Sequence, residues 1–284
     1  MDISLLIENQ DVAAENGAVF ERKNPVTGEV VTRAAAASVA DAVRAVDAAQ
    51  AAFGAWSALG PNARRMHLLK AADALEARSA DFVSAMMAET GATAAWAGFN
   101  AHLAASMLRE AASLTTQVSG EVIPSDKPGC VALAMRRPAG VVLGIAPWNA
   151  PVILGVRAIA TPLACGNTVV LKASEMCPRT HRLIGEAFRD AGVPSGVLNI
   201  VTNAPLQAAQ VVEALVAHRA VRRVNFTGST KVGRIIAELA ARQLKPVLLE
   251  LGGKASFLVL DDADLDEAVA AAAFGAFFNQ GQIC

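Results

Sequence analysis

Tyrosine is absent from this chain of 284 residues, and neither sign of charge is in excess. The missing tyrosine excludes the short-chain dehydrogenases, whose chemistry uses a tyrosine hydroxyl. Lys and Arg number 25 against 26 Asp and Glu, which gives a formal net charge of -1. Nucleic-acid-binding proteins usually carry a concentrated basic face, and no block of basic residues occurs here. We therefore expect no nucleic-acid partner.

The chain also lacks a metal-binding or disulfide pattern of cysteines. Cys130, Cys165, Cys177 and Cys284 form no C-x-x-C pair. Zinc sites and disulfide-rich small folds need closer spacing than this. We expect free thiols and no metal.

No apolar run is long enough to span a membrane. The most apolar stretch, VVLGIAPWNAPVILGV, is interrupted by Pro147, Asn149 and Pro151, so it is too broken for a transmembrane helix. The N-terminal residues lack the basic region and the apolar core of a signal peptide. These features predict a cytoplasmic protein without a membrane partner.

Apolar residues make up 54% of the chain, which is enough for a large core. In the first part of the chain, apolar spacing and start signals such as Ser38, Asp41 and Pro61 predict helices. The turn-rich stretch that follows predicts a hairpin that leaves the main body. The predicted helices span residues 39–56, 62–78, 80–90 and 93–116, and the hairpin spans residues 117–138.

From residue 141 onward, short apolar strands alternate with helices. This alternation predicts an α/β fold with a parallel sheet that helices cover on both faces. Ligands of such folds bind at the carboxyl ends of the strands. The predicted strands are 141–146, 168–172, 197–202, 221–227, 246–251 and 256–261, and the helices are 153–164, 179–191, 206–217, 231–241 and 265–278.

Polar residues follow the first two of these strands. Asn149 lies near a helix start, where it either caps the helix or points its amide at a ligand oxygen. Lys172 and Glu175 are either solvated charges or contacts to a ribose diol. A carboxylate at a ribose repels a 2'-phosphate, so the second alternative favours NAD over NADP.

The strand 221–227 ends in GSTKVG, and a helix follows. Gly228 and Gly233 predict a tight turn in which the backbone can approach another group closely. The free N–H groups at the start of the helix suit a phosphate. The stretch is not a P-loop, because Arg234 and Ile235 stand where that motif needs Lys and Ser or Thr. G-x-G-x-x-G does not occur in the chain.

Two reactive side chains complete the candidate set. Glu250 falls within the apolar stretch VLLELGG, and burial there raises a glutamate pKa towards that of a general base. The alternative is a structural glutamate in a salt bridge. Cys284 is either a nucleophile or a buried small apolar residue.

Taken together, these stretches resemble the aldehyde dehydrogenase superfamily over essentially the whole chain. Within it, the chain is most similar to bacterial dehydrogenases for aromatic aldehydes, the salicylaldehyde type above all. The superfamily resemblance rests on PWN (147–149), LKASE (171–175), FTGSTKVG (226–233), ELGGK (250–254) and FNQGQIC (278–284), and the finer one on residues 89–100, 146–154 and 220–230.

The resemblance implies a role for each motif residue. Cys284 matches the nucleophile, Glu250 the general base and Asn149 the side-chain donor to the oxyanion. It implies NAD-dependent oxidation of an aromatic aldehyde to the acid, through a thiohemiacetal and a thioester on the cysteine. The implied cofactor contacts are Trp148, Lys172, Ser174, Glu175, Gly228, Ser229, Gly233, Leu251 and Gly252.

The resemblance also implies a domain organisation. Residues 1–116 and 139–252 would form a Rossmann-like NAD-binding domain, residues 117–138 an oligomerisation hairpin, and residues 253–284 the start of a catalytic domain. Family members run beyond the cysteine, so we expect an N-terminal fragment that is inactive and poorly soluble alone. The full-length chain is expected to form a homodimer or a homotetramer.

Arg157 is the only charge in PVILGVRAIATPLA. It lies eight residues after Asn149, roughly two helical turns, so we expect both to face one tunnel in which Arg157 orients a polar aromatic aldehyde. A structural ion pair is the alternative. For the protein as a whole, the alternative function is a nucleotide-binding or structural protein without activity. Such a protein would explain the phosphate turn but not Glu250 together with Cys284.

Overall fold

The computed structural model describes all 284 residues. The first 37 residues, for which no strand was predicted, form five short strands. Two of them extend the main sheet, and the others form a separate three-stranded sheet in the order β1-β5-β4. The strands are β1 (Asp2–Ile3), β2 (Leu5–Ile7), β3 (Gln10–Val12), β4 (Val19–Lys23) and β5 (Val30–Ala35).

The four helices predicted next are confirmed, with small shifts at their ends. Side chains fix two of the starts: Ser38 and Asp41 form a reciprocal capping box, and the Thr93 hydroxyl accepts from the backbone N–H of Trp96. Pro61 occupies the first turn of the second helix. The helices are α1 (Val39–Ala58), α2 (Pro61–Ala77), α3 (Ser79–Thr90) and α4 (Ala94–Leu114).

A seven-stranded sheet in the order β12-β11-β8-β9-β10-β2-β3 forms the centre of the molecule. Its first five strands are parallel to one another, and β2 pairs antiparallel with β10. The prediction of a parallel sheet is therefore confirmed. The elements are β8 (Val141–Ile145), α5 (Pro151–Ala164), β9 (Thr168–Lys172), α6 (Pro178–Asp190), β10 (Leu198–Val201), the 3-10 turn η1 (Pro205–Gln207), α7 (Ala208–Ala217), β11 (Val221–Gly228), α8 (Thr230–Arg242) and β12 (Val247–Leu251).

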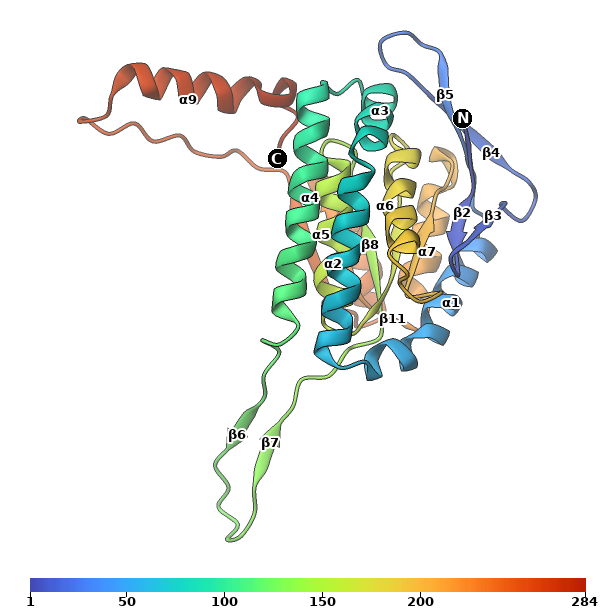
Figure 1. Cartoon of the computed structure of the whole chain (residues 1–284), viewed down its shortest axis with the longest axis vertical. Coiled ribbons are helices and arrows are strands. Elements are labelled where there is room, and N and C mark those ends of the chain that lie inside the picture. Colours follow the sequence, from blue (N-terminus) through green and yellow to red (C-terminus); the bar gives the residue numbers. More distant parts are fainter.

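Helices cover both faces of this sheet (Figure 1). Alternate strand residues point to opposite faces: Val142 belongs to the core under α2 to α6, and its neighbour Leu143 belongs to the core under α1, α7 and α8. The chain runs from β8 out to β10 and then returns to place β11 on the other side of β8. The direction of winding reverses between β8 and β11, and ligands bind at such a point in doubly wound sheets.

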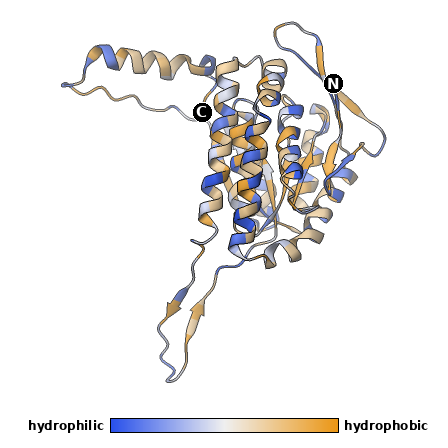
Figure 2. Ribbon diagram, in the orientation of Figure 1, coloured by the Kyte–Doolittle hydropathy of each residue, from blue (hydrophilic) through white to orange (hydrophobic).

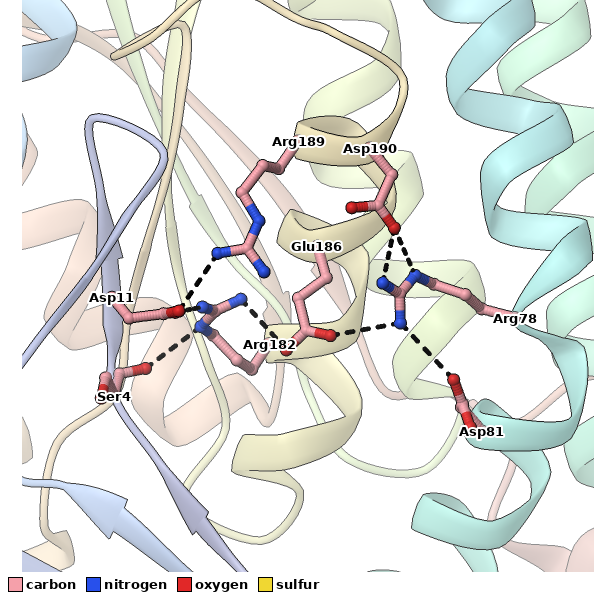
Figure 3. Close-up of polar contacts among 8 residues, drawn as sticks. All are labelled: Ser4, Asp11, Arg78, Asp81, Arg182, Glu186, Arg189 and Asp190. Carbon is pink, nitrogen blue, oxygen red and sulfur yellow. Dashed lines mark hydrogen bonds and ion pairs between the residues drawn. The ribbon is translucent and has the colours of Figure 1, made fainter.

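An ion-pair network joins the N-terminal strands to the body (Figure 3). Arg182 of α6 is buried, pairs with Asp11 and Glu186, and donates from Nε to the carbonyl of Ser4 at 3.1 Å. Arg78, at the end of α2, reaches the other side of Glu186 at 3.3 Å. The network thus ties β3 and the residue before β2 to α6, and α6 to the end of α2.

Two parts project from this body (Figure 1). Strands β6 (Glu121–Ile123) and β7 (Ala132–Ala134) form the predicted hairpin, which is confirmed as a separate two-stranded sheet. Helix α9 (Leu265–Phe277) buries none of its residues, although Figure 2 colours it mainly hydrophobic. The turn η2 (Phe278–Gly281) follows it.

The predicted strand 256–261 is wrong. Residues 252–260 are extended but form no strand, and residues 253–260 are exposed. A strand needs a neighbour that satisfies its backbone hydrogen bonds, and no strand lies beside this segment. None of the helices is both long and apolar enough to cross a membrane.

Candidate active site

Two adjoining clefts open at the carboxyl edge of the main sheet. The first, of about 670 Å³, is lined by Asn149, Glu250 and Cys284 among others. The second, of about 580 Å³, lies between the ends of β8, β9 and β11 and the helices α7 and α8. Six of the predicted cofactor residues line the second cleft: Trp148, Lys172, Ser174, Glu175, Gly228 and Ser229. Trp148, Gly228 and Ser229 line both clefts, which makes them continuous.

Asn149 sits between β8 and α5, where its backbone carbonyl is held from two sides. Trp96 Nε1 donates to that oxygen at 2.9 Å, and Asn279 Nδ2 donates to it at 3.3 Å. The side chain of Asn149 does not cap α5, because Ala150 occupies that position. Its Nδ2 instead donates to the carbonyl of Gln282 at 2.7 Å. The capping alternative is therefore wrong, and the amide points into the first cleft.

The C-terminal residues fold back over this cleft. Asn279, Gln280 and Gly281 have φ values of 49°, 55° and 70°, a left-handed run that reverses the chain after α9. The carbonyl of Cys284 accepts from the backbone N–H of Gly253 at 3.0 Å. Cys284 is exposed in this chain of 284 residues.

Phe278 anchors this segment to the body through an aromatic cluster. Its ring meets Trp96 edge-on with the ring centroids 4.9 Å apart, and it lies 6.4 Å from Phe99. Phe274 stacks on its outer side at 4.6 Å. Because Trp96 also holds the carbonyl of Asn149, one indole links the end of the chain to the start of α5.

Glu250 is exposed, which contradicts the prediction that it is buried. Strand β12 is an edge strand, and only Val247, Leu249 and Leu251 pack on the core. Alternation then points Leu248 and Glu250 away from the core. The carboxylate forms no ion pair either, so neither alternative from the sequence describes it.

Lys172 is buried and pairs with the half-buried Glu175, so the alternative of solvated charges is wrong. Lys172 Nζ binds Glu175 Oε1, and Asn203 Nδ2 donates to the same oxygen at 3.0 Å. Burial opposes ionisation of Glu175, but the charge and hydrogen bonds of Lys172 and Asn203 outweigh it, and the pKa of Glu175 lies below its usual value. The second cleft therefore carries a fixed negative charge beside a positive one.

The turn at the end of β11 opens helix α8. The Ser229 hydroxyl accepts from the backbone N–H of Val232 at 3.3 Å, which caps the helix. A Cβ on Gly228 would lie 2.5 Å from the Phe226 ring, and one on Gly233 would lie 2.6 Å from Leu251 Cδ2. The groups that approach these two glycines closely are therefore the side chains of Phe226 and Leu251. Gly233 lines neither cleft but lets α8 pack on β12, while Leu251 and Gly252 line the first cleft.

Arg157 does not share a cleft with Asn149, which contradicts the prediction. It lines a third cleft of about 590 Å³, together with Cys165 and Glu250. Eight residues advance a helix by roughly 80° beyond two full turns, which turns Arg157 away from the first cleft. Its Nη2 donates to the hydroxyl of Thr227 at 3.1 Å, and it forms no ion pair. The alternative of a structural ion pair is therefore wrong as well.

Sequence reasoning missed two buried residues behind the clefts. His181 accepts from the backbone N–H of Ser174 at Nδ1, at 3.0 Å, and its Nε2 faces the carbonyl of Pro151 at 3.1 Å. Burial lowers its pKa to about 4, so it is neutral and donates from Nε2. Asn203 follows β10 at the same sheet edge. The strand-end rule, applied to β10, would have found Asn203, whereas no signal in the sequence marks His181.

No group of three metal-ligating side chains occurs in the structure. The four cysteines are free, as predicted, and of these only Cys284 lines the first cleft.

Comparison with known proteins adds to this geometry. The aldehyde dehydrogenase family matches residues 12–284. A vanillin dehydrogenase of Pseudomonas fluorescens is 68% identical over 100% of this chain and 59% of its own length. The crystal structure of a salicylaldehyde dehydrogenase from Pseudomonas putida G7, complexed with salicylaldehyde, gives a TM-score of 0.98 at 50% identity, again over 100% of this chain and 59% of that one. An NADP dependent enzyme of E. coli gives 0.95 at 34% identity, over 99% and 58%. The chain thus spans less than two thirds of the length of these relatives.

Proposed function

The chain belongs to the aldehyde dehydrogenase family, and on that premise we propose that the whole protein oxidises an aromatic aldehyde to its carboxylic acid with NAD. The observation that carries the proposal is the first cleft, which brings together a thiol, a carboxylate and an amide from three distant segments. Vanillin and salicylaldehyde dehydrogenases are among its relatives, which supports an aromatic substrate. The cluster of Trp96, Phe99 and Phe278 beside Asn149 offers aromatic surface next to the same cleft.

Cys284 is the proposed nucleophile. Addition of its thiolate to the aldehyde carbon forms a carbon–sulfur bond and leaves a negative oxygen on a tetrahedral thiohemiacetal. The amide of Asn149 and the backbone N–H of Cys284 are the proposed donors to that oxygen. The Asn149 amide donates to the carbonyl of Gln282 in this structure, so it would exchange that acceptor for the oxyanion. Removal of one such donor costs about two to three powers of ten in rate.

Glu250 is the proposed base of the second half of the reaction. Oxidation of the thiohemiacetal leaves a thioester on Cys284, which water must hydrolyse. Glu250 lines the same cleft as the thiol and, as an exposed carboxylate, meets solvent directly. It would take a proton from the attacking water, so that the acid leaves and the thiol is restored.

The residues of the second cleft fit a dinucleotide. The paired carboxylate of Glu175 suits the hydroxyls of a ribose, and the first N–H groups of α8 suit a pyrophosphate. Trp148, Leu251 and Gly252 line the first cleft, where the nicotinamide end would lie. NAD supplies the hydride acceptor when it is bound. One neighbour is named as NADP dependent, so the choice of NAD rests on Glu175 and not on the fold.

We further propose the division into an NAD-binding domain (1–116 and 139–252), an oligomerisation hairpin (117–138) and the start of a catalytic domain (253–284). The projecting hairpin and the exposed α9 support it. A cytoplasmic homodimer or homotetramer belongs to the same proposal.

The test follows reduced nicotinamide by absorbance when the full-length protein meets vanillin or salicylaldehyde with NAD. Cys284→Ala should abolish the signal while NAD still binds, and Cys130→Ala, which removes the other exposed cysteine, should leave it unchanged. Glu250→Gln should give one rapid turnover per site and then a slow phase. Full activity in Cys284→Ala would overturn the proposal.

A further inference from the structure

Asn203 is a fully buried side chain that the proposed reaction does not use. It follows β10, one strand beyond the strand that carries Lys172. Its Nδ2 donates to Glu175 Oε1 at 3.0 Å and to the carbonyl of Ala204 at 2.9 Å. Its Oδ1 has no hydrogen-bond partner in the structure. A buried amide of this kind needs an explanation, because a buried oxygen without a partner is unfavourable.

The orientation of this amide is fixed by what surrounds it. Turned over, the amide would place Oδ1 against the carboxylate of Glu175 and the carbonyl of Ala204, which are both acceptors. Nδ2 must therefore face Glu175, and Oδ1 is left on the other side. The cost of leaving Oδ1 unpaired is offset by the hydrogen bond from Nδ2 to the charged carboxylate of Glu175. Hydrogen bonds to charged groups are among the stronger ones.

The two side chains that hold Glu175 bind the same carboxylate oxygen. Lys172 and Asn203 both bind Oε1, from β9 and from the residues after β10. The Lys172 side chain is 6% exposed and the Glu175 side chain is 21% exposed. Glu175 lines the second cleft, and Asn203 lies behind it. The carboxylate is thus anchored at its inner oxygen while part of it remains open to the cleft.

We propose that Asn203 is a positioning residue that sets the preference for NAD over NADP by fixing Glu175. The inference rests on the proposed function, because it concerns the same dinucleotide cleft. A ribose diol donates hydrogen bonds to a fixed carboxylate, whereas a 2'-phosphate brings negative charge against it and removes one donor. Without Asn203, the carboxylate loses one of the two side chains that hold it and can then turn away from the ribose. NAD should then bind more weakly and NADP more tightly.

The experiment measures the dissociation constants of NAD and NADP by calorimetry on the full-length protein, so it needs no turnover. Asn203→Ala should lower the preference for NAD by about tenfold. The matched control is Asn199→Ala, in the strand β10 that Asn203 follows. Asn199 is also fully buried and makes two hydrogen bonds, to Gly196 and Glu8, but none to Glu175. The control should keep the preference. If Asn203→Ala does not fold, Asn203→Ser, whose hydroxyl falls short of Glu175, gives the same comparison.

A second arm separates positioning from general structure. In a Glu175→Gln background the carboxylate is gone, so Asn203→Ala should not lower the preference further. An equal fall in both backgrounds, an equal loss of affinity for both dinucleotides, or an unchanged preference in Asn203→Ala would overturn the inference. A wild-type protein that binds neither dinucleotide would overturn the proposed function itself and this inference with it.

Discussion

Around Glu175 the side chains of Lys172, His181 and Asn203 are buried, whereas Glu250 and Cys284 lie on segments that are exposed along most of their length. In the first group, Lys172 ends β9, Asn203 follows β10, and His181 belongs to α6, which packs on the seven-stranded sheet. The second group belongs to an edge strand and to residues 253–284, which contact the body at few places. The candidate site is therefore built from two regions. One is held by buried side chains, and the other lies on mostly exposed segments.

The difference shows how each region holds its functional groups. At the second cleft, called the cofactor cleft from here on, buried side chains hold one another, because a buried polar group needs a partner. At the first cleft, the holding contacts are the backbone bond between Gly253 and Cys284, two hydrogen bonds that join Asn149 to Gln282 and to Asn279, and the ring of Phe278. Regions with few buried apolar contacts open at lower free energy than the core. We therefore expect the two clefts to differ in local stability.

The largest expected effect comes from removing matched rings in the two regions. Phe188 of α6 is 2% exposed, and Phe274 of α9 is 65% exposed. Phe188→Ala should lower the free energy of unfolding by about 3–5 kcal/mol, because it leaves a cavity in the core. Phe274→Ala should change the free energy of unfolding of this 284-residue chain by less than about 0.5 kcal/mol. Urea unfolding followed by circular dichroism measures both, and equal losses would remove the distinction between the regions.

His181, which lies behind the cofactor cleft, makes the stability of the protein depend on pH. Burial holds the pKa of His181 at about 4 against 6.5 in the unfolded chain. Between these values the unfolded state binds the proton and the folded state does not, so stability falls as the pH drops from 6.5 towards 4. The loss reaches about 3 kcal/mol for the imidazole. Lys172, Glu175 and Cys177 are the ionisable groups nearest to it.

His181→Gln removes this proton-binding group. The stability of the wild type relative to this variant should therefore fall as the pH drops through that window, whereas contributions from other groups largely cancel in the difference. His102→Gln, which removes an imidazole from the exposed side of α4, serves as the control. A difference between wild type and His181→Gln that does not change with pH would show that His181 binds its proton equally in both states.

The same division between centre and edge explains which features the sequence could predict. The buried strands β8 and β9 are mostly apolar runs, and these runs predicted both the parallel sheet and the position of its carboxyl edge. That edge in turn predicted that Asn149, Lys172, Glu175 and Glu250 lie near one another. Local pattern decides such features, because the residues involved are neighbours in sequence.

The errors concern relations between distant segments. The apolar neighbours of Glu250 suggested burial, but its exposure follows from the edge position of β12, which no local window records. The segment 256–261 has strand composition and lacks only a pairing partner. The contact of His181 with Ser174 and Pro151 depends on how α6 packs on α5, and the hydroxyl that meets Arg157 comes from β11. Packing of this kind is set by the whole fold.

The smallest expected effect lies where the two regions meet, at Phe278. The contact of its ring with Trp96 contributes about 1 kcal/mol. Phe278 is also the first residue of the turn η2. Phe278→Ala should therefore speed exchange of the Gly253 amide, which donates to Cys284, by roughly fivefold. The Ala173 amide, which donates to Val201 at 2.8 Å behind the cofactor cleft, should keep its rate. Hydrogen exchange read by NMR compares the two amides in one sample. If both amides accelerate together, the clefts open as one unit; if only Gly253 responds, the nucleophile is held to the body chiefly by one ring.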